Sequence, residues 1–316
     1  MSPLISIVMP AFNAAKYIEA SMSSVMSQSC KDWELVVVND GSTDSTQEIV
    51  ERYVKLDSRI KLVNQTNRKQ AAARNTGIQN ATGNWVAFLD ADDTWPPNKL
   101  TEQLEVSHLG DVLYTSGVTY FEETSLQEHY QIHAGPVSGH EMFIMLYDWN
   151  PIPNLSVMVK REWIERVGFQ NEHALVVGCE DWEYWIRLAK NGASFYGLDR
   201  ELFIYRVHAG GTSRNRLRMK IAKVYAKACN LNAAIDDPRA TSMFVIEVDQ
   251  LLRTLLWENR TEDATRIIEQ SRKAESLRYP LEYFLLTSWF ALPGKLILAC
   301  TKPLSFIKRI VVKFIN

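Results

Sequence analysis

In the first hundred residues, the hydrophobic and polar positions follow two patterns in turn. Short, continuous apolar runs are typical of strands that are covered on both faces. Between them, apolar residues recur every three to four positions, which is typical of helices. Alternating strands and helices predict right-handed βαβ units and an α/β fold with a mostly parallel sheet and helices on both faces. The predicted strands are residues 5–9, 34–38, 60–63 and 85–89, and the predicted helices are residues 14–27, 43–56 and 70–80, with Ser42 or Thr43 as the N-cap of the second.

The pattern after residue 100 is more mixed. A helix is predicted over residues 181–190, with Trp182, Trp185 and Ile186 facing inward. Helical spacing dominates from residue 216 to residue 275. The loop at 209–215 therefore predicts the boundary between an α/β domain over residues 1–215 and a helical C-terminal region over residues 216–316. Further strands are predicted at residues 112–115, 118–121, 155–159, 195–198 and 202–207.

Composition narrows the class of protein. The chain has 316 residues, 46% of them hydrophobic, which is enough to bury a substantial core. Its 35 Lys and Arg nearly balance its 37 Asp and Glu, so a nucleic-acid partner is not predicted. Four scattered cysteines without a CxxC pair predict free thiols in a reducing compartment. We find no secretory signal and no uninterrupted apolar run of about 20 residues, so a cytoplasmic protein is expected.

Three predicted strands end in residues that suit ligand binding. In an open parallel sheet, ligands bind at the carboxyl ends of the strands. The relevant ends are Pro10 to Asn13, Asn39 to Ser42, and Asp90 to Asp93, and we expect them to share one rim. The clustered carboxylates suit a hard cation such as Mg²⁺ or Mn²⁺ that bridges a diphosphate. The alternative is a solvated acidic loop that ends a strand and caps the next helix.

Two residues on this rim have a nucleoside-binding interpretation and a structural one. Asp40, which precedes a glycine, either forms a turn or accepts the imide N–H of a uracil- or thymine-type base. Both roles are compatible. Phe12 either stacks on that base or belongs to the core.

Charged residues elsewhere also have two interpretations each. Arg74, in AAARNTG, either pairs with Asp90 or a ligand phosphate, or forms a surface ion pair that contributes little to stability. Glu180 or Asp181 is a general base, or both simply stabilise the N-terminal end of a helix.

A histidine in a glycine-containing loop completes the candidates. His208 precedes Gly210 and has Arg206 and Arg214 nearby, so a basic flap over a diphosphate is one interpretation. The other is that a lone histidine in a loop has no specific role.

These segments together resemble the family 2 nucleotide-sugar glycosyltransferases of the GT-A fold. The matching stretches occur in family order and cover roughly the first 215 residues. They are SIVMPAFNAAKYI, ELVVVNDGSTDST, AAARNTGI, GNWVAFLDADDTW, CEDWEYWIRLAKNG and YRVHAGGTS.

The resemblance implies an inverting transferase that uses a nucleotide-diphospho-sugar, of UDP type by preference, with Mn²⁺ or Mg²⁺. Asp181 matches the position of the base, Glu180 is an acceptor contact or helper beside it, and Asp92 binds the metal. The resemblance also implies that Pro10, Phe12 and Asp40 would hold the nucleoside. By it, Arg74 and Asp90 would contact the nucleotide or order the metal loop, and His208 would lie near the diphosphate. The predicted nucleotide-sugar-binding residues are Pro10, Phe12, Asn13, Asp40, Arg74, Asp90, Ala91 and His208.

The chain departs from the family pattern in two places. Arg68, Lys69 and Gln70 stand where relatives often have glycines, which predicts altered contacts to the donor. Asn39 stands where an aspartate is frequent.

The segment from Leu281 onward mixes aromatic, aliphatic and basic residues. Such a tail predicts contact with a membrane surface, peripheral at the inner face, and suits a lipid-linked or surface-polysaccharide acceptor. The alternative is a helical subdomain packed on the catalytic domain. Two other functions stay open at this point: a nucleotidyltransferase, and a sugar-nucleotide-binding protein without turnover.

Overall fold

The computed structural model describes residues 4–210, 215–231, 237–258, 260, 262–263, 266–267 and 270. The chain divides into two compact units, residues 1–244 and 245–316. The division predicted at residue 215 stays a prediction. Arg214, Cys300 and the tail from Leu281 lie outside the described residues. Cys30 and Cys179 are free thiols. In the part of the chain that is described, no helix has the length and apolar character needed to cross a membrane.

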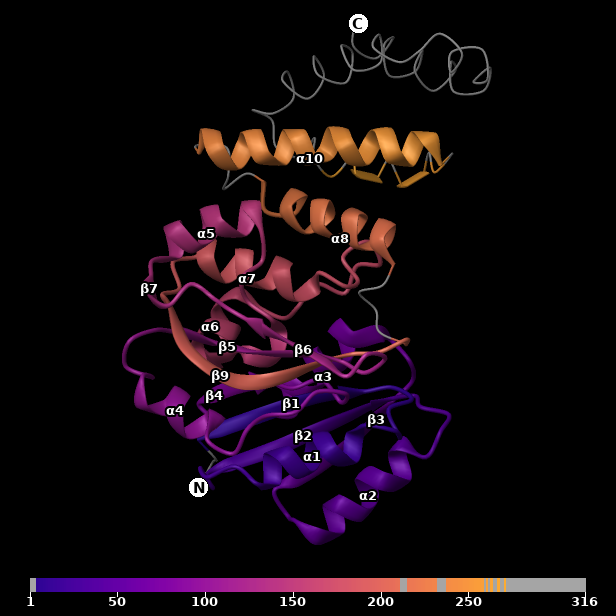
Figure 1. Cartoon of the computed structure of the whole chain (residues 1–316), viewed down its shortest axis with the longest axis vertical. Helices are drawn as coiled ribbons and strands as arrows, with labels where there is room; N and C mark the ends of the chain where they lie inside the picture. The colour runs from indigo at the N-terminus through magenta and orange to yellow at the C-terminus, as the bar shows by residue number, and fades with distance from the viewer. Residues whose placement is uncertain are drawn as a thin grey trace, which may run out of the picture. The chain divides into compact units, whose positions relative to one another are not determined.

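Strands and helices alternate through the N-terminal part of the chain, as the pattern predicts (Figure 1). The strands are β1 (Ile5–Ala11), β2 (Trp33–Asp40), β3 (Ile60–Gln65), β4 (Trp85–Phe88), β5 (Val112–Phe121), β6 (Leu126–Tyr130), β7 (Gly135–Val137), β8 (Met158–Lys160) and β9 (Phe195–Val207). The helices are α1 (Ile18–Met26), α2 (Thr46–Leu56), α3 (Lys69–Asn80), α4 (Lys99–Glu105), α5 (Gly139–Asp148), the 3₁₀ turn η1 (Asn154–Ser156), α6 (Arg161–Val167), α7 (Glu180–Lys190), α8 (Arg216–Ala228) and α10 (Pro238–Trp257).

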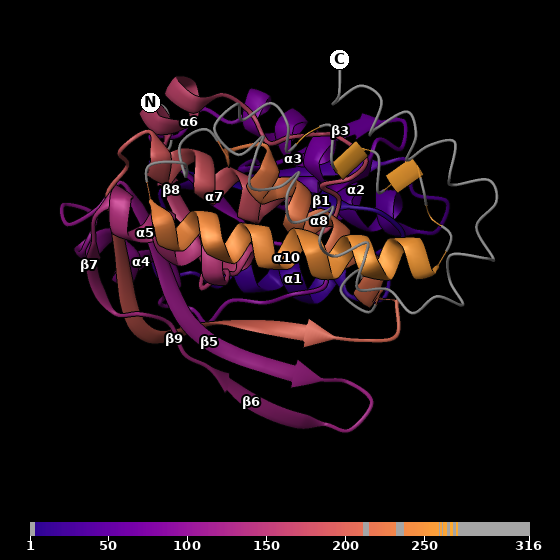
Figure 2. The ribbon, with the colours of Figure 1, turned by 90° about the horizontal axis from the view of Figure 1, so that it is seen from above.

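Within the described residues, nine strands form one mixed sheet. Its order is β3-β2-β1-β4-β8-β5-β9-β7, and β6 pairs with β5. The first four strands are parallel, whereas β8 is antiparallel to both of its neighbours. Figure 2 shows the β5–β6 hairpin at the periphery, beside the end of β9. The parallel half follows from the βαβ pattern, and beyond β4 the sheet is mixed, since β5 and β9 pair in parallel while β6, β7 and β8 pair antiparallel.

Helices cover both faces of the parallel half. On one face, Ile7 and Met9 of β1 join a core cluster that includes Ile18 of α1 and Ile49 of α2. On the other face, the β2 residues Val36 and Val38 pack against Ala73 of α3. Burial on both faces explains why these strands are continuous apolar runs rather than alternating ones.

The parallel register brings the strand ends level with one another. Ala11 pairs with Asn39, so the end of β1 lies beside the end of β2. Val8 pairs with Phe88, and the amide of Leu89 donates to the carbonyl of Val8, so Asp90 follows at the same edge.

The first two helices begin later than the pattern predicts. The amide of Thr43 donates to Asn13 Oδ1 at 2.8 Å, and the amide of Ala15 donates to Asp44 Oδ2 at 3.1 Å. These bonds hold both segments in turns, so α1 begins at Ile18 and α2 at Thr46. The prediction of Ser42 or Thr43 as the N-cap is wrong, because Ser45 occupies that position.

The middle of the chain differs from the prediction in continuity. The two strands predicted over residues 112–121 are one strand, β5, with an irregular register around Ser116. The two predicted over residues 195–207 are also one strand, β9. The strand predicted at 155–159 is shorter, because Asn154–Ser156 forms a 3₁₀ turn and β8 begins at Met158. Trp185 and Ile186 are buried as predicted, whereas Trp182 is only partly buried.

Candidate functional site

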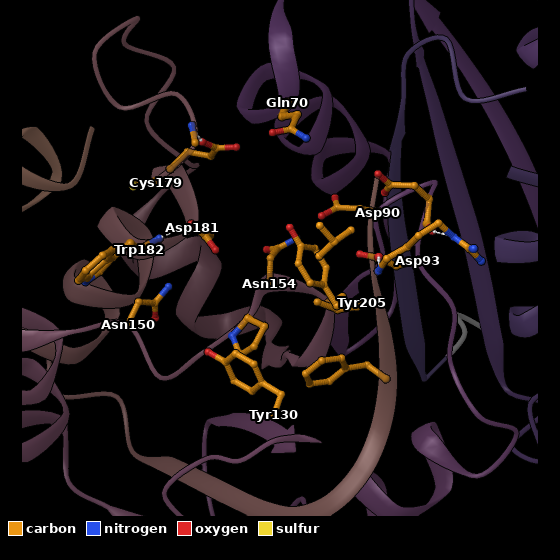
Figure 3. A pocket seen from close by; sticks show the side chains of 18 of the residues that line it. Gln70, Asp90, Asp93, Tyr130, Asn150, Asn154, Cys179, Asp181, Trp182 and Tyr205 are labelled. Carbon is orange, nitrogen blue, oxygen red and sulfur yellow. Dashed lines mark hydrogen bonds between the residues drawn. The ribbon is translucent and has the colours of Figure 1, made fainter. Parts of the chain in front are cut away.

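The ends of β1, β2 and β4 meet at two adjoining cavities. The Phe12 cavity, of about 470 Å³, lies over the ends of β1 and β2. The Asp181 cavity, of about 400 Å³, lies between the residues that follow β4 and the beginning of α7 (Figure 3). The cavities share four lining residues, namely Gln70, Asp90, Asp92 and His208. The shared rim expected from the sequence is therefore present.

Most of the predicted nucleotide-sugar residues line the Phe12 cavity. Phe12 itself is 50% exposed, so its ring is free to contact a ligand and is not part of the core. Arg74 is the exception, because it lines the Asp181 cavity instead. The predicted residues in the wall of the Phe12 cavity are Pro10, Phe12, Asn13, Asp40, Asp90, Ala91 and His208.

Asn13 shapes the wall of this cavity through its backbone. Its φ is +48°, a left-handed conformation that asparagine tolerates better than most residues. Its amide donates to Ser42 Oγ at 3.0 Å, while its own Oδ1 accepts from the amide of Thr43. Asn13 thus ties the end of β1 to the loop after β2.

The Asp40 carboxylate is buried and already holds the loop after β3. It accepts hydrogen bonds from Gln65 Nε2 at 2.7 Å, from the amide of Arg68 at 2.8 Å, and from the amide of Lys69 at 2.9 Å. A carboxylate has about four lone-pair directions, so one is left for a ligand. The structure therefore gives Asp40 a loop-organising role, and its contact with a base stays a prediction.

The three carboxylates after β4 have separate partners. Asp90 accepts from the Arg74 guanidinium at 2.8 Å, and Asp92 lies 3.0 Å from His208 Nε2. Asp93 is buried and accepts from the amide of Arg206 at 2.7 Å, while its Oδ2 has no partner in the described structure. Burial, with help from the neighbouring carboxylates, raises the pKa of Asp92 and of Asp93. Asp93 lines the Asp181 cavity alone, whereas Asp90 and Asp92 line both cavities.

Arg74 is a buried connector between the two sides of the Asp181 cavity. Its guanidinium binds Asp90 at 2.8 Å and Glu180 at 2.9 Å, and its side chain is 4% exposed. Burial lowers the pKa of Arg74, but the charges of Asp90 and Glu180 together raise it by more than burial lowers it, so the guanidinium stays charged. The surface-pair interpretation of Arg74 is therefore wrong.

The two acids at the start of α7 have different partners. Glu180 accepts from Arg74 with one oxygen and from the amide of Gly178 at 2.5 Å with the other. Among the hydrogen bonds of the described residues, the Asp181 carboxylate accepts only one, from the adjacent amide of Trp182 at 2.7 Å. Burial and the charge of Glu180 raise the pKa of Asp181 to about 7, against the opposing charge of Arg74. Asp181 is thus the carboxylate with a free oxygen and a pKa suited to taking up a proton near neutral pH.

The end of β9 lies over the acidic loop. The carbonyl of Asp92 accepts from Arg206 Nε at 3.1 Å, and the His208 ring lies 4.8 Å from the Tyr17 ring, centroid to centroid. The Arg206 guanidinium also lies over the Tyr17 ring at 5.3 Å. Arg206 and His208 therefore lie against the acidic loop, and a flap over a diphosphate stays a prediction.

Several lining residues escape a search for motifs. Figure 3 shows Tyr130, Asn150, Asn154 and Tyr205 around the Asp181 cavity, together with Trp182. Asn154 is 6% exposed, and neither Oδ1 nor Nδ2 of its side chain has a hydrogen-bond partner in the described structure. Tyr130, Asn150 and Asn154 come from the middle of the chain, outside the stretches that resemble the family. Lys69 and Arg218 likewise line the Phe12 cavity without a motif.

The side chains at the junction of the cavities fit a hard divalent cation. No group of three His, Cys, Asp or Glu side chains arranged to hold a metal is found in the described parts of the chain. Mg²⁺ and Mn²⁺, however, commonly take one or two protein carboxylates and complete their coordination with water and substrate phosphate. Asp92, with His208 beside it and Asp90 near it, supplies such a partial set of ligands.

Comparison with known proteins places this geometry in context. Residues 6–168 match the family model described as "Glycosyl transferase family 2". TuaG of Bacillus subtilis, whose name assigns it to teichuronic acid biosynthesis, is 34% identical over 221 residues, which is 68% of this chain and 83% of TuaG. The Escherichia coli UDP-Glc:α-D-GlcNAc-diphosphoundecaprenol β-1,3-glucosyltransferase WfgD is 44% identical over 115 residues, 36% of this chain and 45% of WfgD.

Solved structures share the fold at low sequence identity. S. aureus TarS in complex with UDP-GlcNAc has a TM-score of 0.57 at 18% identity and covers 89% of this chain and 92% of that one. The mannosyltransferase PcManGT of Pyrobaculum calidifontis, in complex with GDP-Man and Mn²⁺, has a TM-score of 0.55 at 20% identity and covers 98% of this chain and 87% of that one. The predicted GT-A fold is confirmed.

Proposed function

Because the chain belongs to glycosyl transferase family 2, we propose that it transfers a sugar from a UDP-sugar to an acceptor hydroxyl, with inversion at the anomeric carbon and with a divalent cation. Family membership decides between the two transferases considered from the sequence, in favour of glycosyl transfer over nucleotidyl transfer. The observation that carries the proposal is Asp181, a carboxylate with a pKa of about 7 in a cavity that shares Asp90 and Asp92 with the Phe12 cavity.

The Phe12 cavity suits the nucleoside of the donor. The exposed ring of Phe12 offers a stacking surface, and the remaining lone pair of Asp40 is an acceptor for the imide N–H of uracil. WfgD is named for UDP-Glc and TarS was solved with UDP-GlcNAc, which supports a uridine donor.

Asp92 and His208 would hold the cation, with Asp90 beside them. Bound there, Mn²⁺ or Mg²⁺ would offset the negative charge that develops on the departing diphosphate. The Mn²⁺ in PcManGT supports this choice of metal. Arg206, over the acidic loop, adds a positive charge on the same side.

The chemical step follows from the two acids of α7. The acceptor oxygen attacks the anomeric carbon, its proton passes to the Asp181 carboxylate, and the bond from the anomeric carbon to the phosphate oxygen breaks with its electrons leaving on the nucleoside diphosphate. A single displacement of this kind inverts the anomeric configuration. Glu180, held by Arg74 and Gly178, keeps the start of α7 in place and raises the pKa of Asp181 by its charge.

The acceptor is proposed to be a lipid-linked or surface-polysaccharide glycan. WfgD is named for a diphosphoundecaprenol-linked acceptor and TuaG for teichuronic acid biosynthesis, which supports this class. Contact of residues 216–316 with a membrane surface belongs to the same proposal.

A thermal-shift screen tests the proposal. Ligands that bind only the folded state raise the melting temperature by mass action. We expect a UDP-sugar to raise it in the presence of Mn²⁺ or Mg²⁺, and to raise it much less in chelator. Asp92→Asn is expected to lose the difference between metal and chelator. If no nucleotide-sugar gives a metal-dependent shift in the wild-type protein, the proposed reaction is wrong.

A further inference from the structure

Lys69, at the start of α3, has an unusual backbone conformation beside the Phe12 cavity. Its φ is +74°, in the left-handed region that side chains with a Cβ rarely adopt. In the neighbouring loop after β2, the chain uses glycine for the same backbone conformation. At Gly41, whose φ is also +74°, an added Cβ would lie 2.9 Å from the amide nitrogen of Asn67. At Lys69, by contrast, the chain keeps a long cationic side chain despite the backbone strain.

The strain is imposed by a buried carboxylate. The amides of Arg68 and Lys69 donate to the two oxygens of Asp40, at 2.8 and 2.9 Å. Gln65 Nε2 adds a third bond to the same carboxylate at 2.7 Å. Since Asp40 is 3% exposed, these bonds are made away from water and fix the backbone of residue 69 at the cavity wall. Strained backbone that the surroundings enforce is found preferentially at ligand sites.

The positive charge of Lys69 is not used within the described protein. Arg68, its neighbour, forms an ion pair with Glu172 at 2.8 Å. No ion pair of the Lys69 ammonium is found among the described residues, and the side chain is exposed and lines the Phe12 cavity. Of the three carboxylates in that cavity, Asp40 is occupied by the loop, Asp90 by Arg74 and Asp92 by His208. The ammonium is therefore available for an anion brought in by a ligand.

We propose that Lys69 is a donor-binding residue whose ammonium contacts the diphosphate of the nucleotide-sugar, held in position by the Asp40-bonded loop. This rests on the proposed function and names one of its contacts. Lysine binds phosphate as a point charge on a flexible stem. Arg218, exposed on the same cavity wall, is a second cation there; it lies in the first turn of α8, where its amide donates to Asn215 Oδ1 at 3.0 Å and its φ is not left-handed.

Two substitutions separate the charge from the strain. Lys69→Gln removes the charge and keeps a long side chain on the strained backbone, whereas Lys69→Gly removes both. We expect both variants to bind UDP about tenfold more weakly than the wild type, as is typical for loss of one charge-assisted contact. Their affinity for uridine, which has no phosphate, is expected to stay within about twofold. Lys69→Gly alone is expected to raise the melting temperature.

Two controls complete the set. Ser125→Gly relieves a left-handed backbone, φ +56°, in the exposed β5–β6 turn, outside both cavities. It is expected to raise the melting temperature and leave UDP affinity unchanged. Lys69→Arg keeps the charge and is expected to bind UDP within about threefold of the wild type. Calorimetric titration at fixed Mg²⁺ and two salt concentrations measures all of these affinities.

The outcomes discriminate between the two proposals. If Lys69→Gln binds UDP as the wild type does, or loses uridine and UDP affinity equally, the contact with the diphosphate is refuted while the proposed function stands. A Lys69→Gln variant whose UDP affinity keeps the full salt dependence of the wild type also refutes it. If the wild-type protein binds no nucleoside diphosphate, the proposed function and this contact both fail.

Discussion

Replacing Arg74 by methionine is the sharpest test of how the site is held together. Arg74 bridges Asp90 and Glu180 at 2.8 and 2.9 Å with a side chain that is 4% exposed. Methionine fills much of the same volume but leaves two carboxylates without their partner. Breaking a buried ion pair by removing one partner costs about 3–5 kcal/mol of the free energy of unfolding. In a domain of this size we expect the melting temperature to fall by roughly 6–20 °C.

Arg68 provides a matched control. Its ion pair with Glu172 has the same 2.8 Å length as the Arg74–Asp90 pair, but its two side chains are 56% and 40% exposed. Surface pairs contribute about 0–1 kcal/mol, so Arg68→Ala is expected to lower the melting temperature by no more than about 4 °C. The two variants thus compare the loss of buried ion pairs with the loss of an exposed ion pair of similar length.

Scanning calorimetry at several pH values measures both effects. The Arg74→Met penalty is electrostatic, so it is expected to shrink as the pH falls and the unpaired carboxylates take up protons. Adding Glu180→Gln to Arg74→Met is expected to recover part of the lost stability. If Arg74→Met costs no more than Arg68→Ala, or if its cost does not depend on pH, the argument from buried charge is refuted.

Three further predictions follow from single residues. The folded state raises the pKa of Asp181 from 3.8 to about 7, so ionisation of this carboxyl destabilises the fold increasingly from pH 4 to 7. By calorimetry, Asp181→Asn should therefore be more stable than the wild type at pH 8 and equally stable at pH 4. In a product assay the variant should be inactive. Wild-type kcat/KM should rise with pH and reach half its maximum near pH 7, and a flat profile across pH 6–8 would contradict the assignment of the base. Gly41→Ala would place a Cβ 2.9 Å from the amide nitrogen of Asn67 on a left-handed backbone. Its free energy of unfolding, measured in urea, should fall by about 1–3 kcal/mol, and its UDP binding should weaken. Unchanged stability would contradict the close approach.

The parallel half of the fold and the three strand ends were predictable from local sequence. Continuous apolar runs and period-3.6 patterns are both local, and a buried parallel strand needs both faces apolar, so residues 5–9 and 34–38 were identifiable without tertiary information. The motifs at the strand ends were equally local. The starts of α1 and α2 were not, because they depend on bonds between Asn13 and Thr43 and between Asp44 and Ala15, about 30 residues apart.

The sequence by itself determined which residue types stand at the rim of the sheet, since strand, turn and helix signals are encoded within a few neighbouring positions. Only the tertiary structure decided how the charges are divided. Arg74 neutralises Glu180 from 106 residues away, and the amide of Arg206 binds Asp93 across 113 residues, whereas Asp181 accepts only from the adjacent amide of Trp182 among the described residues. The role of a carboxylate depends on its partners and its burial, and both are set by segments that meet only in the folded chain.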